Sequence, residues 1–269
     1  MSIFDTEELA RKVLFKPHLW LFLDYDGTLA DFEPTPETIH PDPRLAHLLR
    51  RLASEPRVRV AIISGRRLTD VQKLVPVSGL FLAGTYGMEL LTSSGKIINR
   101  VQIDDLRPYL DEVKPDWIQL ITGKTGFYIE DKGMSLALHA RFSSDEEAEQ
   151  VLSLARETVD RILPGELFRI LGGHKFLEAA PLLAHKGKTV SYLLEAFPWP
   201  EAQLVYIGDD DKDEEAFEVV KTHAGIAIKV IEETSSQLTK ADYVLTSPAA
   251  VRSWLENLET LLLGGEIPN

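Results

Sequence analysis

Leu19-Trp20-Leu21-Phe22-Leu23-Asp24-Tyr25-Asp26-Gly27-Thr28 is the stretch of sequence that decides the fold. Its first five residues form a continuous apolar run, which is typical of a strand buried on both faces of a parallel sheet. The run ends abruptly at Asp24, and Gly27 allows the chain to turn sharply away. Ligands bind beyond the carboxyl ends of strands in open α/β sheets, so Asp24 and Asp26 are candidates for a functional site.

Two further apolar runs end in polar residues in the same way. The run from Val58 to Ile63 stops at Ser64-Gly65-Arg66, and the run from Leu204 to Ile207 stops at Gly208-Asp209-Asp210-Asp211-Lys212-Asp213. If the three strands are neighbours, their polar ends converge at one edge of the sheet. Several carboxylates in one crevice repel each other unless a hard cation such as Mg2+ neutralises them. The acids expected there are Asp24, Asp26, Asp209 and Asp213.

Helical and strand patterns alternate through the beginning and the end of the chain. Leucines at positions 45, 48, 49 and 52 follow the i, i+3, i+4, i+7 spacing of an amphipathic helix. The alternation predicts an α/β fold with a Rossmann-like, doubly wound parallel sheet. Further helices are expected over residues 68–74, 187–197, 216–220 and 251–263, and further strands over residues 80–83, 225–228 and 243–245.

The pattern changes in the middle of the chain. Apolar side chains alternate with other residues over 134–141, and this period of two predicts a strand with one buried face. Similar strands are expected over 126–131 and 175–180, with a helix over 145–163. We therefore expect a core domain made of residues 1–103 and 182–269, and an inserted, smaller α/β cap domain over residues 104–181.

The composition excludes several classes of protein. The 269 residues are 44% hydrophobic and 26% charged, which is ordinary for a soluble globular protein. A net charge of -13 disfavours nucleic-acid binding. The absence of cysteine excludes disulfides, thiolate metal sites and a cysteine nucleophile. No apolar stretch is long enough for a membrane span, and the acidic N-terminus does not look like a secretory signal, so we expect a cytoplasmic protein.

The polar strand ends suit phosphoryl transfer. A carboxylate such as Asp24 can attack phosphorus and form an aspartyl-phosphate, which divides one difficult step into two. A second carboxylate two residues later, Asp26, can protonate the leaving oxygen and then deprotonate the hydrolytic water. A metal ion and a lysine can neutralise charge on the phosphoryl oxygens. The Thr28 hydroxyl and the backbone N–H groups near Gly27 can contact the phosphate.

These motifs resemble, in the same order, the four motifs of the haloacid dehalogenase superfamily of phosphatases. The second motif is matched by Ile62-Ile63-Ser64-Gly65-Arg66, and the third by Lys186 in His185-Lys186-Gly187-Lys188. The resemblance implies that the Ser64 hydroxyl binds the phosphoryl group, with Gly65 and Arg66 as further substrate-binding residues. It also implies that Mg2+ is bound by Asp24, by the backbone carbonyl of Asp26 and by Asp209. Asp213 would either bind the ion directly or contact the groups that bind it.

Longer stretches are similar to the trehalose-6-phosphate phosphatase family within that superfamily. They cover residues 130–141, 176–187, 208–217 and 243–258. The resemblance implies that an inserted cap selects the substrate and that trehalose 6-phosphate is hydrolysed to trehalose and phosphate. Two positions depart from the family pattern, because Lys212 stands where Thr is usual and Tyr86 stands where His is usual.

Three charged residues of the insertion are candidates for binding the sugar. Glu130 and Lys132 are two residues apart, so they point to the same face of a strand, and Glu178 lies on another expected strand. Charged groups on one sheet face can hydrogen-bond several hydroxyls and reject analogues that lack them. The alternative is that these residues form cross-strand ion pairs on an exposed sheet surface. His139 and Arg141 are open to the same two interpretations.

Other activities are compatible with the same motifs. A sucrose-phosphate phosphatase, a glucosyl- or mannosyl-3-phosphoglycerate phosphatase, or a phosphotransferase would use the same Asp24 and Asp26. A non-catalytic binding protein would not require both carboxylates of the first motif, so the catalytic interpretation is favoured. We expect a small sugar phosphate as the partner, no nucleic acid or membrane, and a monomer.

Overall fold

The computed structural model describes residues 6–31, 40–231 and 238–264. The chain forms two compact units, the first made of Met1–Ile98 and His185–Asn269 and the second of Asn99–Ala184. Residues 1–5, which enter the expectation about a secretory signal, lie outside the described residues. Within the described ranges, no helix combines the length and the apolarity that crossing a bilayer requires.

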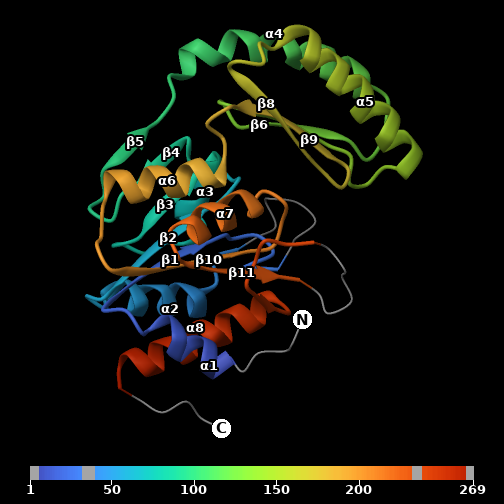
Figure 1. The fold of residues 1–269 in the computed structure, drawn as a ribbon. Helices are drawn as coiled ribbons and strands as arrows, with labels where there is room; N and C mark the ends of the chain where they lie inside the picture. Colours follow the sequence, from blue (N-terminus) through green and yellow to red (C-terminus); the bar gives the residue numbers. More distant parts are fainter. Residues whose placement is uncertain (1–5, 32–39, 232–237, 265–269) are drawn as a thin grey trace. The chain divides into compact units, whose positions relative to one another are not determined.

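An eight-stranded, mostly parallel sheet forms the centre of the first unit (Figure 1). Its strands are β1 (His18–Leu23), β2 (Val58–Ile63), β3 (Phe81–Gly84), β4 (Glu89–Leu91), β5 (Ile97–Asn99), β10 (Ala202–Gly208), β11 (Ile226–Val230) and β12 (Tyr243–Leu245). Their order is β12-β11-β10-β1-β2-β3-β4-β5. The strands from β12 to β3 in that order pair in parallel, and β4 runs antiparallel to β3. β1 therefore lies between β10 and β2, as the convergence of their polar ends requires.

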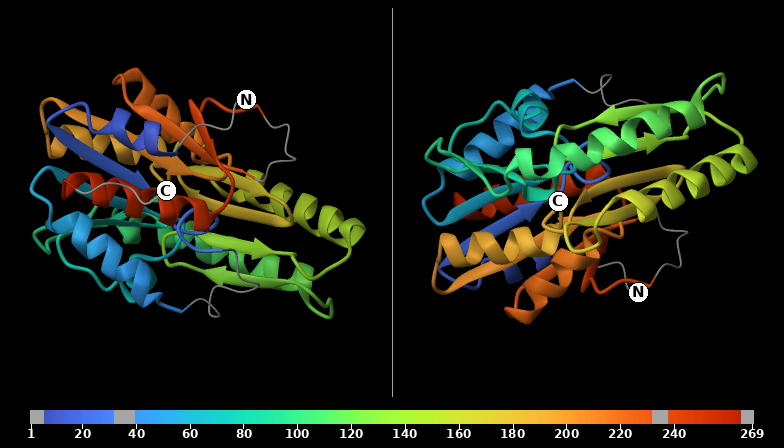
Figure 2. Two further views of the ribbon diagram at one scale, coloured as in Figure 1. Left: turned by 90° about the horizontal axis from the view of Figure 1, so that it is seen from below. Right: turned by 90° about the horizontal axis from the view of Figure 1, so that it is seen from above.

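Helices cover both faces of this sheet. One layer contains α1 (Thr6–Val13), α2 (Pro43–Ser54), α3 (Leu68–Leu74) and α8 (Pro248–Leu262), and the other contains α6 (Lys186–Ala196) and α7 (Glu214–Thr222). Figure 2 shows α8 in front of the central sheet when the protein is seen from below and α6 in front of it when the protein is seen from above. The predicted doubly wound α/β fold is confirmed.

The central strand explains why the sequence shows a continuous apolar run. Leu19, Leu21 and Leu23 pack into the hydrophobic cluster under α2 and α8. Trp20 and Phe22 point the other way and pack with residues of α6 and α7. A strand covered on both faces needs an apolar side chain at every position, so alternation disappears.

The second unit consists of a four-stranded antiparallel sheet and two helices. The sheet has the order β6-β7-β9-β8, and all pairings are antiparallel. The elements are α4 (Ile103–Ile121), β6 (Tyr128–Asp131), β7 (Leu136–His139), α5 (Asp145–Ile162), β8 (Phe168–Gly173) and β9 (Phe176–Pro181). Leu136, Leu138 and Leu177 pack against the helices. Both helices therefore cover the same face of the sheet, as Figure 1 also shows.

Five elements were not predicted, namely α1, β4, β5, α4 and β8. α4 contains Pro108 and Pro115, and proline inside a helix removes a backbone hydrogen bond. Its buried residues are Leu106, Leu110, Val113 and Trp117, which follow helical spacing along one side. Packing of this stripe in the hydrophobic cluster of the second unit outweighs the local cost of the prolines.

Candidate active site

The first motif follows the end of β1. The Asp24 N–H donates to the Ile207 carbonyl of β10 at 2.9 Å, which ties this strand end to its neighbour. Gly27 has a φ of 77°, a left-handed conformation that glycine adopts without steric cost. Its N–H donates to the Ala30 carbonyl at 2.8 Å, so the chain folds back directly after the motif. Asp24 is held at this turn with only 5% of its surface exposed.

The second motif follows β2 and brings Ser64 and Arg66 to the same edge. The Ser64 hydroxyl accepts a hydrogen bond from the Arg66 N–H at 3.1 Å. The Arg66 guanidinium donates to both oxygens of Asp26, from Nε at 2.8 Å and from Nη2 at 2.7 Å. A two-point pair of this kind fixes the orientation of both side chains. The structure thus joins the first and second motifs through Asp26.

Tyr86, one of the departures from the family pattern, lies against the second motif. Its backbone is left-handed, with a φ of 56°, and is held by a hydrogen bond from its N–H to the Ser64 carbonyl and by one from the Thr189 hydroxyl to its own carbonyl. A Cβ atom on Gly65 would lie 2.7 Å from the Tyr86 hydroxyl. Only glycine at position 65 therefore allows the tyrosine ring to come this close to the loop.

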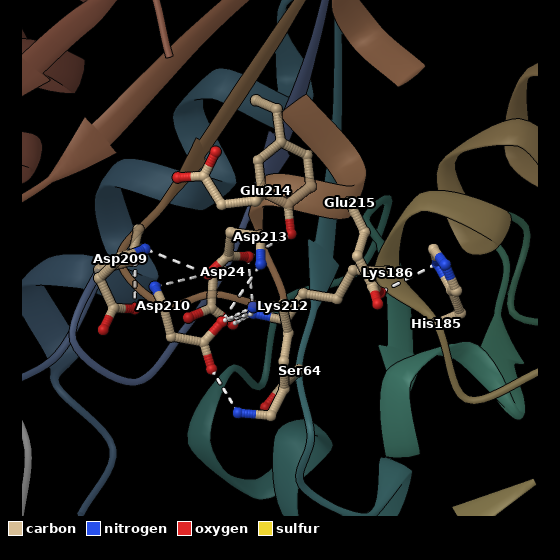
Figure 3. A network of polar contacts seen from close by, with 12 residues as sticks. Asp24, Ser64, His185, Lys186, Asp209, Asp210, Lys212, Asp213, Glu214 and Glu215 are labelled. Carbon is tan, nitrogen blue, oxygen red and sulfur yellow. Dashed lines mark hydrogen bonds and ion pairs between the residues drawn. The ribbon is translucent and has the colours of Figure 1, made fainter. Parts of the chain in front are cut away.

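Lys186 begins α6 and reaches the acids of the other strand ends. His185 caps this helix by accepting the Lys188 N–H at 3.2 Å. The Lys186 Nζ lies 2.6 Å from Asp213 Oδ1 and 2.8 Å from Asp24 Oδ1 (Figure 3). The lysine is buried, so it is not the solvated surface residue that a lone lysine usually is.

Asp213 folds back under the loop that carries Asp209. One of its oxygens accepts the backbone N–H groups of Asp209 and Asp210 at 3.1 and 3.0 Å. The other accepts the Tyr206 hydroxyl at 2.7 Å as well as Lys186. A Cβ atom on Gly208 would lie 2.2 Å from the Asp213 carboxyl carbon, so this arrangement requires glycine there.

Two further contacts complete the loop after β10. The Thr28 hydroxyl lies 3.2 Å from Asp209 Oδ1 and donates to it, so it orients that carboxylate. The Lys212 Nζ donates to Asp210 Oδ2 at 2.8 Å. Lys212, the second departure from the family pattern, is therefore paired with an acid of its own loop.

Burial changes the protonation equilibria of this cluster. Burial, together with the nearby Asp213, raises the pKa of Asp209 to about 7, and burial raises the pKa of Asp213 to about 8. Burial also raises the pKa of Asp24 well above its usual value, although Lys186 acts in the opposite direction. For Lys186, burial lowers the pKa, but Asp213 and Asp24 outweigh it and the net shift is upward. When all of these acids are ionised, they carry more negative charge than the lysines neutralise.

The donor set fits a hard divalent cation. One carboxylate oxygen from each of Asp24, Asp209 and Asp213 lies within 4.8 Å of the others. With Asp210, the four acids face two ammonium groups, those of Lys186 and Lys212, so two negative charges are left over. Oxygen-only ligands with that residual charge suit Mg2+.

The candidate sugar-binding residues lie in the second unit. Glu130 pairs with Ala137, which pairs in turn with Glu178, so both carboxylates are on the sheet face opposite the helices. The Lys132 Nζ donates to both oxygens of Glu178 at 3.1 Å, and the Ser135 hydroxyl donates to one of them at 2.5 Å. Lys132 and Glu178 are buried, so they do not form an ordinary surface ion pair.

Sequence reasoning did not find three residues of these clusters. Tyr206 was counted as one residue of the apolar run 204–207. The signal that could have identified it is its hydroxyl group, which stands near the end of a buried strand where the site was expected. Tyr128 stands two residues before Glu130, which was the available signal. Ser135 stands three residues after Lys132, so no such spacing pointed to it. The Tyr128 ring stacks on His139 at 4.3 Å, and His139 Nε2 lies 3.0 Å from Glu130 Oε2.

Comparison with known proteins agrees with this geometry. A family model described as trehalose-phosphatase matches residues 22–249. A trehalose-phosphate phosphatase of Mycobacterium bovis is 31% identical over 243 residues, which cover 88% of this chain and 60% of that relative. The chain thus spans about three fifths of the length of that relative.

Solved structures show the same fold. The C-terminal domain of a C. albicans trehalose-6-phosphate phosphatase superposes with a TM-score of 0.83 and 21% identity, with 97% of each chain covered. A haloacid dehalogenase-like hydrolase from Bacteroides thetaiotaomicron gives a TM-score of 0.61 at 17% identity, with 90% of this chain and 99% of that one covered. Because the family model matches most of its length, the chain belongs to the trehalose-phosphatase family.

Proposed function

We propose that the protein is a Mg2+-dependent phosphatase that hydrolyses trehalose 6-phosphate to trehalose and phosphate through an aspartyl-phosphate on Asp24. The observation that carries the proposal is the position of the Asp24 carboxylate, which is buried 2.8 Å from the Lys186 ammonium and clustered with Asp209 and Asp213. A nucleophile for phosphorus needs neighbouring positive charge, because both the carboxylate and the phosphate are anions. Family membership supports a sugar phosphate as the substrate.

In the first half of the reaction, an oxygen of Asp24 bonds to phosphorus as the bond from phosphorus to the sugar oxygen breaks. Asp26, in its protonated form, gives its proton to the departing oxygen. The Ser64 hydroxyl, the Gly65 backbone and Lys186 bind the phosphoryl oxygens. Asp24 and Asp209, together with the Asp26 carbonyl, would hold Mg2+, with Asp213 beside them. When bound, the ion supplies charge neutralisation on the phosphoryl group.

In the second half, water attacks the phosphorus of the aspartyl-phosphate. Asp26, now a carboxylate, takes a proton from the water as the new phosphorus–oxygen bond forms. The bond from phosphorus to the Asp24 oxygen breaks, which releases phosphate and restores the Asp24 carboxylate. One residue therefore serves as acid and then as base, and no proton is gained or lost by the enzyme.

Arg66 has a place in this cycle because it holds both oxygens of Asp26. While the guanidinium occupies both Asp26 oxygens, neither is free to face the leaving oxygen of a substrate. Arg66 must therefore release at least one Asp26 oxygen when the substrate arrives. The incoming phosphoryl group could replace that Asp26 oxygen as the acceptor of the guanidinium N–H groups, because carboxylate and phosphoryl oxygens are both anionic acceptors.

We assign substrate selection to the insertion over residues 104–181 and catalysis to the core of residues 1–103 and 182–269. Glu130, Lys132 and Glu178 would bind the sugar hydroxyls, and Thr28 would support the core site. A buried ion pair such as Lys132–Glu178 contributes little net stability, because desolvation offsets the attraction. A role in substrate recognition would explain why such a pair is present. We further propose that the protein acts as a monomer in the cytoplasm.

A panel of phosphate esters tests this function. The panel contains trehalose 6-phosphate, sucrose 6-phosphate, glucosyl-3-phosphoglycerate and p-nitrophenyl phosphate, each with Mg2+ and with EDTA. We expect the highest kcat/KM with trehalose 6-phosphate and no turnover in EDTA, with recovery when Mg2+ is restored. A preference for another sugar phosphate would overturn the substrate, and activity that resists EDTA would overturn the metal. Absence of turnover on all of them would favour a binding protein.

A further inference from the structure

Lys229 is a buried cation that none of these chemical steps uses. It lies in β11, where its four neighbours, Ile226, Ala227, Ile228 and Val230, are all apolar, and only 2% of its surface is exposed. Its ammonium donates to the Asp210 carbonyl at 3.0 Å and to Glu214 Oε1 at 3.3 Å. A buried ammonium is costly unless it is paired and hydrogen-bonded, so a residue of this type at this position calls for an explanation.

The contact with the Asp210 carbonyl fixes the backbone of the loop that carries Asp209. The carbonyl of Asp210 is bound by Lys229, while the N–H of Asp210 donates to Asp213 Oδ2 at 3.0 Å. The peptide groups on both sides of this residue are therefore oriented by side chains from two different elements. Asp209 precedes it directly, so the same contacts set the direction in which the Asp209 carboxylate points.

Glu214 anchors Lys229 to a third segment. Its carboxylate also accepts the Thr239 hydroxyl at 2.7 Å and the Lys240 N–H at 2.8 Å. Lys229 thus connects β11, the loop after β10, and the chain that leads into β12. Because each end of this connection is held by several hydrogen bonds, the ammonium has a defined position under the loop.

We infer that Lys229 is a positioning residue for the cation site, acting through the Asp210 carbonyl to present the Asp209 carboxylate. The inference rests on the proposed Mg2+ site. Residues that orient metal ligands typically contribute about 10- to 100-fold to metal affinity. Removing the ammonium should therefore weaken Mg2+ binding by roughly that factor and loosen the loop even when no metal is present.

The test compares Lys229→Met with Lys221→Met. Lys221 is exposed on α7, its ammonium lies within bonding distance of the Lys240 carbonyl and of Asp242, and replacing it with methionine removes the same charge. Mg2+ binding is measured by isothermal titration calorimetry, and amide hydrogen exchange of residues 209–213 is measured in EDTA. We expect Lys229→Met to bind Mg2+ about 10- to 100-fold more weakly and to exchange these amides faster, with Lys221→Met close to the parent on both counts.

Two more variants separate positioning from simple filling of space. Lys229→Arg keeps the charge and the N–H donors and should recover part of the Mg2+ affinity. Lys229→Gln keeps most of the volume but is too short to reach the carbonyl, so it should bind Mg2+ as weakly as Lys229→Met. If Lys229→Met does not fold, Lys229→Gln decides the question. Parent-like Mg2+ affinity and parent-like exchange in a folded Met or Gln variant would overturn the inference.

The same experiment distinguishes the two proposals. If the parent protein binds no Mg2+, the proposed function fails, and exchange in EDTA still reports whether Lys229 holds the loop. If the parent binds Mg2+ and the Lys229 variants match it both in Mg2+ affinity and in amide exchange, only the positioning role fails.

Discussion

The core and the insertion use buried charge in different ways. In the core, Asp24, Asp209 and Asp213 crowd together with too few lysines, which leaves negative charge for a cation to neutralise. In the insertion, Lys132 and Glu178 form a matched pair on a sheet face. An unbalanced cluster suits chemistry on a charged group, whereas a balanced one suits recognition of neutral hydroxyls. Substitutions in the core should therefore affect every phosphate ester, and substitutions in the insertion should affect only sugar phosphates.

The largest effect is expected from Asp24→Asn. An amide cannot attack phosphorus, so kcat should fall on the order of 10⁴-fold or more for trehalose 6-phosphate and p-nitrophenyl phosphate alike. Removing a buried acid from a crowded cluster should not destabilise the fold, and thermal unfolding checks this. Appreciable activity on either ester in a folded variant would remove Asp24 from the nucleophilic role.

Asp26→Asn should separate the two substrates by their leaving groups. Loss of general acid catalysis costs roughly 10²- to 10⁴-fold, but only when the leaving oxygen needs a proton. p-Nitrophenolate leaves without one, so formation of the phosphoenzyme from that ester should be nearly unaffected. Burst kinetics with both esters measure this step. Equal losses in the burst rate would show that Asp26 is not the acid.

The insertion is tested by Glu130→Gln and Glu178→Gln. Hydrogen bonds to charged groups contribute about 1.5–3 kcal/mol, so kcat/KM for trehalose 6-phosphate should fall about 10- to 100-fold. The value for p-nitrophenyl phosphate should stay close to that of the parent, because this ester lacks the sugar. Lys114→Met is a matched control, since Lys114 lies on α4 and binds Asp131 on the other face of the sheet. Equal losses on both esters would refute sugar recognition by these carboxylates.

The smallest effect is a contrast in how the two units respond to pH without metal. The folded-state pKa of Asp209 is raised from 3.8 to about 7 by burial and by Asp213, so its contribution to stability is lost as pH rises between about 4 and 7. The pKa of Asp131 is held well below its usual value by the hydrogen bonds from Arg107, so its contribution is lost as pH falls.

Hydrogen exchange in EDTA should therefore show the core opening more readily toward neutral pH and the insertion toward acid. Mg2+ should remove the trend in the core, because it favours the ionised form of Asp209, and Asp209→Asn should weaken that trend in the metal-free protein. The insertion should respond to neither change. A common pH profile for the two units would contradict the contrast.

The strand ends of the core could be predicted closely from the sequence. The apolar run 58–63 is β2, residue for residue, and the run 19–23 differs from β1 only by including one residue fewer. The limits of buried parallel strands are easy to predict for two reasons. Their residues are apolar on both faces, and polar residues follow them at the edge of the sheet where ligands bind. The positions of Asp24, Ser64 and Asp209 followed directly from those ends.

Other features depend on contacts between distant residues and left no local signal. α4 was missed because it contains two prolines, which disfavour a helix. Its stability comes from packing against residues that are distant in the sequence. The approach of Tyr86 to Gly65 and the four hydrogen bonds on Asp213 were equally invisible, since each joins separate loops. The sugar-binding role of Glu130, Lys132 and Glu178 stays a prediction, although they share one sheet face.

Trapping the phosphoenzyme tests the central claim most directly. Asp26→Asn is mixed with p-nitrophenyl phosphate and Mg2+, quenched in acid, digested and examined by mass spectrometry. We expect a burst of one p-nitrophenol per enzyme and one phosphoryl group on Asp24, with neither seen in EDTA. A phosphoryl group on another residue, or turnover of this ester without any covalent phosphate, would contradict the account.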